Sequence, residues 1–200
     1  VHWYFITGLD VVDTDGTAAA VVLLGDSITD GYGCTTDANN RWTDELARRL
    51  QSNPHTQRVG ILNHGIGGNR LLRDGLGPNA LARFDRDVIC QTGVRWLVIL
   101  EGINDLGTRN EARAKGESFA TAAEVIAAYG QMIERAHTHG IRVIGATLLP
   151  FEGSKNYWTA DGDEDRVELW RLPPPLLGDG ALSAQRPQRI IGVQFRQAAL

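Results

Sequence analysis

The chain has 200 residues, of which 42% are hydrophobic, and this is enough for one globular domain with a sizeable core. Its net charge of −4, without a basic patch or interleaved basic and aromatic residues, argues against a nucleic-acid-binding protein. No apolar run approaches the ~20 residues that a bilayer span needs, so no membrane span is expected.

The first part of the chain predicts a strand, a helix and a second strand. Apolar residues over Ala18–Leu24 are typical of a buried parallel strand. Trp42, Leu46 and Leu50 then follow at helical spacing, and Asn40 is a candidate cap for this helix. The second strand is predicted over residues 58–63.

The middle of the chain continues this alternation. A glycine-rich loop, Gly65–Asn69, precedes a short helix over Asn79–Val88 and a strongly apolar strand over Val94–Leu100. A long amphipathic helix marked by apolar residues from Ala122 to Ala136 ends at Gly140, and a fourth strand follows over residues 141–149. Repeated alternation with apolar strands predicts an α/β fold, in which helices cover both faces of a parallel sheet.

Two terminal segments differ from this pattern. Residues 1–17 form an N-terminal segment that is either an extra strand or the remnant of an upstream module. Residues 18–170 form the predicted domain, and residues 171–200 form an atypical tail, in which Pro173-Pro174-Pro175 and four arginines accompany a single acid, Asp179. Within the tail, only residues 189–195 have a strand-like pattern.

Each of the first three predicted strands ends in a loop of small and polar residues. The loops are Gly25-Asp26-Ser27, Asn63–Arg70 and Gly102-Ile103-Asn104-Asp105. Because parallel strands deliver their carboxyl ends to one edge of a sheet, Ser27, Gly68 and Asn104 are expected to converge. Each loop alone is also an ordinary turn or helix cap, but three in succession favour a functional site.

The three residues have complementary chemistry. A serine hydroxyl can attack a carbonyl carbon, and the oxyanion that forms needs hydrogen-bond donors held in place beforehand. The backbone N–H of Ser27, the backbone N–H of Gly68 and the side-chain amide of Asn104 are three candidate donors. Glycine suits the second position because the backbone there must approach the substrate closely.

These loops resemble the sequence blocks of the GDSL, or SGNH, hydrolases. The run from Gly25 to Gly31 resembles the first block, Gly68 matches the glycine of the second, and Gly102-Ile103-Asn104-Asp105 matches the Gly-x-Asn-Asp of the third. The resemblance covers roughly residues 18–158. It implies a flavodoxin-like three-layer α/β/α sandwich and a serine ester hydrolase of the carboxylesterase, lipase or acetylesterase type. Ser27 would be the nucleophile, and Gly68 and Asn104 would complete the oxyanion hole.

The resemblance also bears on ligands and location. It implies no metal or organic cofactor, a small-molecule ester or acylated glycan as substrate, and a secreted or extracytoplasmic bacterial protein. The chain begins at Val1 and shows no signal peptide.

Trp42, Tyr157 and Trp158 are candidates for lining a groove, or else they pack within the core or the loops. The chain lacks the Gly-x-Ser-x-Gly elbow of the α/β-hydrolases, which argues against that fold.

A general base for Ser27 is not identifiable. The family takes its histidine and carboxylate from a late Asp-x-x-His block, whereas this chain has no such block and no histidine after His139. Among the five histidines, only His64 is expected at the same sheet edge as Ser27, and a loop-packing role is favoured for it. A change of reading frame after about Arg166 would explain both the missing block and the unusual tail.

Two alternative functions remain open, as does the state of the cysteines. The chain could be an impaired SGNH-like module that binds acyl or glycan ligands. It could also be a flavodoxin-like phosphate or nucleotide binder, although it lacks the usual phosphate-binding glycine motifs. Cys34 and Cys90 are expected to be two thiols, with a disulfide as the alternative.

Overall fold

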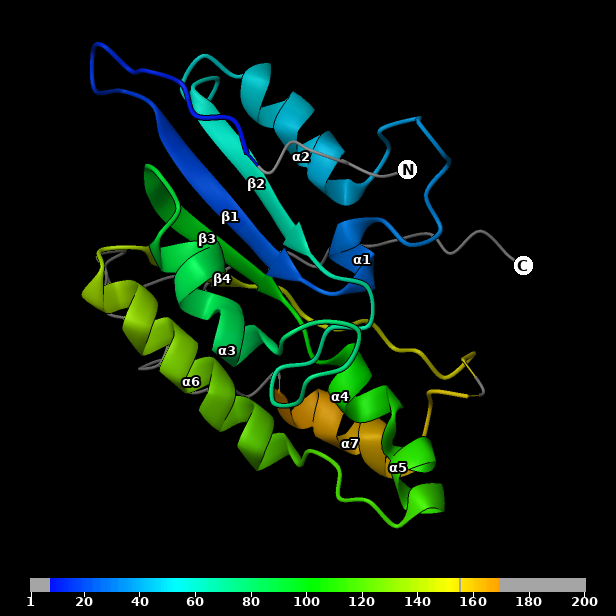
Figure 1. The fold of residues 1–200 in the computed structure, drawn as a ribbon. Coiled ribbons are helices and arrows are strands. Elements are labelled where there is room, and N and C mark those ends of the chain that lie inside the picture. The colour runs from blue at the N-terminus through cyan, green and yellow to red at the C-terminus, as the bar shows by residue number, and fades with distance from the viewer. Residues whose placement is uncertain (1–7, 155, 170–200) are drawn as a thin grey trace, which may run out of the picture.

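Four parallel strands form the central sheet in the computed structural model, which describes residues 8–154 and 156–169. Their spatial order is β2-β1-β3-β4, with bounds β1 Ala19–Gly25, β2 Val59–Gly65, β3 Val94–Leu100 and β4 Arg142–Gly145 (Figure 1). In the centre of the sheet, Leu24 of β1 lies opposite His64 of β2 and Ile99 of β3. All seven residues of β1 are buried, as expected for an apolar central strand of a parallel sheet.

Helices cover both faces of this sheet (Figure 1). Their bounds are α1 Ser27–Asp30, α2 Trp42–Gln51, α3 Ala80–Phe84, the π-helical turn η1 Asp85–Ile89, α4 Ile103–Gly107, α5 Arg109–Lys115, α6 Ala122–Thr138 and α7 Ala160–Leu169. Because side chains alternate along a strand, Val22 and Leu24 of β1 face the same core as Phe84 and Val88. On β2, Asn63 points to the other face, where its amide donates to the carbonyl of Thr29 in α1.

The chain therefore forms the predicted three-layer α/β/α sandwich, and the first three strands lie close to their predicted positions. The fourth strand, predicted over residues 141–149, is shorter and ends at Gly145. The cap of α2 is different from the prediction. The N-cap is Arg41 rather than Asn40, and the Arg41 backbone N–H donates to the carboxylate of Asp44 at 2.9 Å. The long helix α6 ends before Gly140, which has φ +71°, a left-handed conformation that suits glycine at a helix end.

The structure adds α7, which the acidic composition of its residues did not predict. It packs against α4 and α6, and the buried guanidinium of Arg109 in α5 bonds to the carboxylates of Asp161 and Asp165. A helix of low amphipathicity can therefore be held by ion pairs from a neighbouring element. Residues 8–17 contain no helix or strand, and the predicted tail, residues 171–200, lies outside the described residues.

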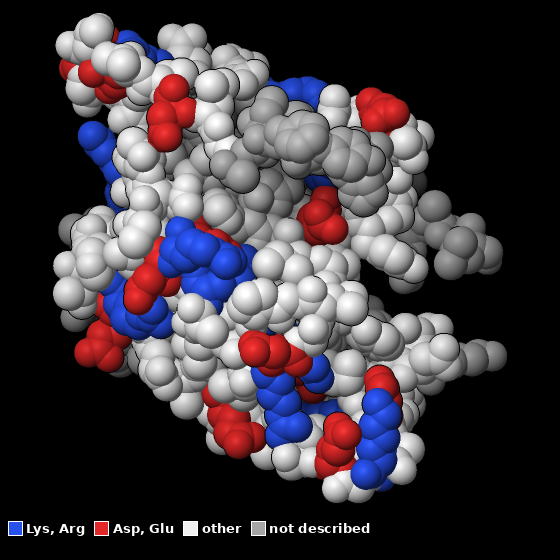
Figure 2. All heavy atoms as spheres, in the orientation of Figure 1, with Lys and Arg blue, Asp and Glu red and all other residues white. Residues whose placement is uncertain are grey.

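Acidic and basic side chains are interspersed on the face shown in Figure 2. Exposed ion pairs such as Lys115–Glu111, at 2.6 Å, join opposite charges, and pairs of this kind contribute at most about 1 kcal/mol. Cys34 and Cys90 are two free thiols, as expected, and both are exposed. Within the described part of the chain, no helix is both long and apolar enough to cross a bilayer.

Candidate active site

Three loops that carry the predicted site residues leave the same edge of the sheet (Figure 1). Ser27 follows β1, Gly68 follows β2, and Asn104 follows β3. The first two loops are joined directly, because the backbone N–H of Ile66 donates to the carbonyl of Gly25 at 3.0 Å. The parallel topology thus brings the three sequence blocks to one edge, as the order of strands and loops predicted.

Ser27 is the first residue of the single-turn helix α1 and is partly exposed. Before it, the buried Asp26 caps the turn, since its carboxylate accepts a hydrogen bond from the backbone N–H of Ile28 at 2.8 Å. Two glycines let α1 pack closely on the strand ends. A Cβ on Gly25 would lie 2.1 Å from the hydroxyl of Thr29, and one on Gly65 would lie 2.2 Å from the backbone nitrogen of Asp30. The position of Ser27 therefore depends on these two glycines.

Gly68 and Asn104 line one cavity of about 310 Å³. Gly68 adopts φ +71°, which few other residues would tolerate. Tyr157 and Arg70 also line this cavity, whereas Ser27 is not among its lining residues. The structure thus brings Gly68 and Asn104 together, with Ser27 on the neighbouring loop at the same sheet edge.

The side-chain amide of Asn104 is held at both of its polar atoms. Its Nδ2 donates to the backbone carbonyl of Asn69 at 2.8 Å, and its Oδ1 accepts from the hydroxyl of Tyr157 at 3.0 Å. An amide nitrogen carries two N–H groups, so the second N–H of Asn104 is left for a ligand. The ring of Tyr157 packs directly on Gly107, where a Cβ would lie 1.9 Å from it. Any larger residue at position 107 would displace Tyr157.

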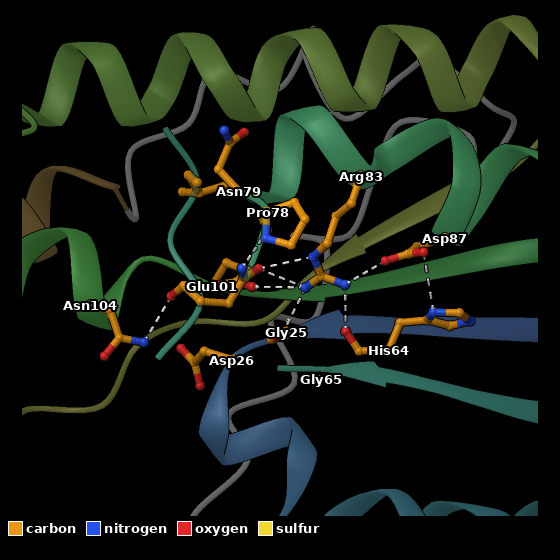
Figure 3. Close-up of polar contacts among 12 residues, drawn as sticks. Gly25, Asp26, His64, Gly65, Pro78, Asn79, Arg83, Asp87, Glu101 and Asn104 are labelled. Atoms are coloured by element: carbon orange, nitrogen blue, oxygen red, sulfur yellow. Dashed lines mark hydrogen bonds and ion pairs between the residues drawn. The ribbon is translucent and has the colours of Figure 1, made fainter. Parts of the chain in front are cut away.

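A buried arginine, Arg83 of α3, points its guanidinium toward the ends of β1 and β2 (Figure 3). Its guanidinium donates to the carbonyls of Gly25 and His64, at the ends of β1 and β2, and to the side-chain oxygen of Asn69. The sequence interpretation missed this residue. The one available signal was a charged residue between the apolar Leu81 and Phe84 on a short helix.

Three buried carboxyl groups lie near the same edge and share one electrostatic environment. Burial raises the pKa of Asp26 to about 7 and that of Asp105 to about 6. Burial also raises the pKa of Glu101 well above its usual range, and the charge of Asp26 adds to this effect. Asp105 accepts from the backbone N–H of Leu71 at 2.9 Å, which ties the second loop to α4.

His64 lies on the face of the sheet opposite α1. Its Nδ1 is 3.9 Å from the carboxylate of Asp87, on the face covered by α3 and η1, whereas the neighbouring Asn63 contacts α1. Burial lowers the pKa of His64. The packing role expected for His64 thus agrees with its surroundings, and its side chain points away from the helix that begins at Ser27.

The other described histidines lie next to the amino ends of strands rather than at the ends that carry the three loops. His55 precedes β2, and His137 and His139 lie at the end of α6, just before β4. These positions are at the amino ends of strands, opposite the edge where Ser27 lies. Among residues 8–154 and 156–169, therefore, no histidine is placed to accept a proton from Ser27.

Comparison with solved structures shows the same fold in esterases. A mutant of Axe2, an acetyl-xylooligosaccharide esterase from Geobacillus, has a TM-score of 0.61 at 20% identity, covering 79% of this chain and 71% of that one. AlinE4, an SGNH-hydrolase family esterase, gives 0.56 at 20% identity, with 80% and 70% covered. A putative lipolytic protein of the G-D-S-L family from Desulfitobacterium hafniense gives 0.53 at 24% identity, with 75% and 69% covered.

A search of curated protein sequences found no match. The family model of the GDSL-like lipase/acylhydrolases matches residues 23–172, which include all three loops and most of the chain. The protein therefore belongs to the GDSL-like lipase/acylhydrolase family of ester hydrolases.

Proposed function

We propose that the protein hydrolyses small carboxylic esters through an acyl-enzyme on Ser27. The observation that carries this proposal is that Gly68 and Asn104 line one cavity beside the loop of Ser27. The Ser27 hydroxyl oxygen would attack the ester carbonyl carbon, and the alcohol would leave as the acyl-serine forms. Water would then attack the acyl-serine, releasing the acid and restoring the hydroxyl.

The developing oxyanion would be stabilised by three N–H donors: the backbone of Ser27, the backbone of Gly68 and the free side-chain N–H of Asn104. Donors that are already oriented are worth more than mobile ones, because no reorganisation is needed in the transition state. The contacts of Asn104 to Asn69 and Tyr157 support this role, since they hold the amide from both ends.

We expect turnover to be weak. Nucleophile and base act as a unit, and loss of the histidine in a serine hydrolase can lower turnover by about 10⁶. About 10³–10⁴ of rate enhancement over water remains from the oxyanion hole and substrate binding. Among residues 8–154 and 156–169, no histidine is placed to take the proton of Ser27, which supports this expectation.

For the substrate, we favour a short acyl group, with a sugar acetate as the specific candidate. The cavity of about 310 Å³ is at the small end of the range for ligand pockets, which favours a short acyl group over a long acyl chain. The similarity in fold to an acetyl-xylooligosaccharide esterase supports a sugar as the alcohol part.

The test is hydrolysis of an aryl acetate together with labelling by a fluorophosphonate, comparing the wild type with Ser27→Ala. We expect slow hydrolysis and labelling, both abolished in Ser27→Ala. Acetate release from an acetylated xylo-oligosaccharide tests the substrate class. Hydrolysis that persists in Ser27→Ala would refute the role of Ser27.

A second candidate function is a binding module for acyl or glycan ligands, favoured because no histidine in the described part of the chain is placed beside Ser27. It predicts that acetylated oligosaccharides bind without hydrolysis and that the fluorophosphonate does not label Ser27. Fast aryl acetate turnover that depends on Ser27 would exclude this candidate.

A further inference from the structure

The contacts of Arg83 converge on the loops that carry the proposed site. Its side chain is fully buried, and replacing a buried ion pair by apolar residues is often neutral or stabilising. We propose that Arg83, acting through Asn69, is a positioning residue that orients the amide of Asn104 for catalysis. This inference rests on the proposed function, because Asn104 is there the donor to the oxyanion.

In the first step, Arg83 holds Asn69 by hydrogen bonds. The Nε and Nη2 atoms of Arg83 donate to the side-chain oxygen of Asn69 at 3.0 and 2.7 Å. The side-chain nitrogen of Asn69 donates to the carbonyl of Pro78 at 2.8 Å, and its backbone N–H donates to the carbonyl of Ile66 at 3.0 Å. Asn69 is completely buried, so it is held from three directions and cannot exchange these partners for water.

The second step runs from Asn69 to Asn104. The backbone carbonyl of Asn69 accepts a hydrogen bond from Nδ2 of Asn104 at 2.8 Å. This bond occupies one N–H and thereby sets the direction of the other, because the two N–H bonds of an amide are fixed in one plane. Whatever holds Asn69 in place therefore orients the N–H proposed to meet the oxyanion.

The third step is the anchoring of Arg83 itself. Its guanidinium lies 3.0 Å from the carboxylate of Asp87 and 3.4 Å from that of Glu101. It also donates to the carbonyls of Gly25, at 3.1 Å, and His64, at 2.8 Å. The rigid planar guanidinium thus fixes the position of Asn69 relative to the ends of β1 and β2. The single ammonium of lysine does not reproduce this geometry.

A double-mutant cycle on kcat tests the proposal. Asn104→Ala is expected to lower kcat by about 10²–10³. Asn69→Ala is expected to lower it by about 10- to 100-fold with little change in KM, since the misplaced donor acts only in the transition state. In the Asn104→Ala background, however, Asn69→Ala and Arg83→Lys are each expected to lower kcat less than about threefold, because the group that they orient is gone.

Arg135→Lys is the matched control. Arg135 of α6 contacts α3 from its other side, bonding to the carboxylate of Asp85 and stacking on Phe84 at 4.8 Å, but it reaches none of the three loops. We expect wild-type kcat for this variant. If the fold-losses of kcat in Asn69→Ala and Asn104→Ala simply multiply in the double variant, the proposal is overturned. A general structural role predicts this result, because independent effects are additive in free energy.

A second readout does not depend on activity. In the ¹H–¹⁵N spectrum of the protein without substrate, the side-chain amide signals of Asn104 are expected to move toward those of a free amide in Asn69→Ala and Arg83→Lys, but not in Arg135→Lys. Unchanged Asn104 signals in the folded Asn69→Ala protein would overturn the proposal. If the wild type shows no Ser27-dependent turnover while the signals move as expected, the proposed function fails and the positioning of Asn104 by Arg83 and Asn69 stands.

Discussion

Replacing Gly65 by alanine would push directly on the helix that begins at Ser27. A Cβ at this position would lie 2.2 Å from the backbone nitrogen of Asp30 and 2.6 Å from the carbonyl carbon of Thr29. Ordinary contacts of a Cβ begin at about 3.4 Å, so the two segments would have to separate by roughly 1.2 Å, the difference between the two distances. The obstructing atoms belong to the backbone of α1 and cannot rotate away as a side chain would.

This geometry sets the expected magnitudes. Overpacking of a well-packed site costs about 1–3 kcal/mol, and we expect the free energy of unfolding of Gly65→Ala to fall by that amount. A displacement of about 1 Å of a reacting group can lower turnover by about 10²-fold. Because α1 carries Ser27, we expect the rate of Ser27-dependent hydrolysis to fall by up to about 10²-fold. This loss of rate would be larger than the loss of folded protein.

Gly60→Ala provides the matched control on the same strand. A Cβ on Gly60 would meet nothing closer than the carbonyl oxygen of Ala19 at 3.8 Å, and neither glycine has a left-handed φ. Urea unfolding gives the free energies, and aryl acetate hydrolysis or fluorophosphonate labelling gives the effect on Ser27. Equal stability and equal reactivity of Gly65→Ala and Gly60→Ala would refute the argument that Gly65 positions α1.

Two further predictions concern protonation and the cavity wall. The pKa of Asp26, raised by burial from 3.8 to about 7, means that its stabilising contribution is full below about pH 4 and is lost as the pH rises through 7. The side-chain amide introduced by Asp26→Asn does not titrate. The free energy of unfolding by urea should therefore fall less from pH 5 to pH 8 in this variant than in the wild type. An equal fall in both proteins would contradict the prediction. Gly107→Ala should displace Tyr157 and lower kcat/KM about tenfold or more, consistent with a misplaced Asn104 amide. Gly153→Ala, whose Cβ would meet nothing within 4 Å, should leave kcat/KM unchanged, and equal values for the two variants would contradict the role of Gly107.

The strands and the three loops could be predicted because their signals are local. Apolar runs such as Val94–Leu100 have the length and composition of buried strands, and each is followed by glycine and polar residues. Parallel topology then requires the following loops to share an edge, so the neighbourhood of Ser27, Gly68 and Asn104 follows without coordinates. The cap of α2 was missed because Asn40 and Arg41 differ by one residue, and a local pattern does not resolve that difference.

The roles of Arg83 and Tyr157 could not be predicted in this way. Arg83 has the composition of an ordinary helix surface residue, and only the packing of α3 turns its guanidinium toward Asn69. Tyr157 is more than fifty residues from Asn104, and its contact exists because Gly107 leaves room for the ring. Helix α7 has little hydrophobic periodicity of its own, and its acidic residues meet an arginine on another helix.

The sequence by itself determined the α/β architecture, the family and the edge of the sheet at which the chemistry lies, because hydrophobic periodicity and glycine loops act over a few residues. Only the tertiary structure decided which side chains hold those loops together and which way His64 points. Those outcomes depend on side-chain packing between distant segments and on the pairing of buried polar groups that water can no longer satisfy. The buried guanidinium of Arg83, which bonds at once to the ends of β1 and β2 and to Asn69, is the clearest example.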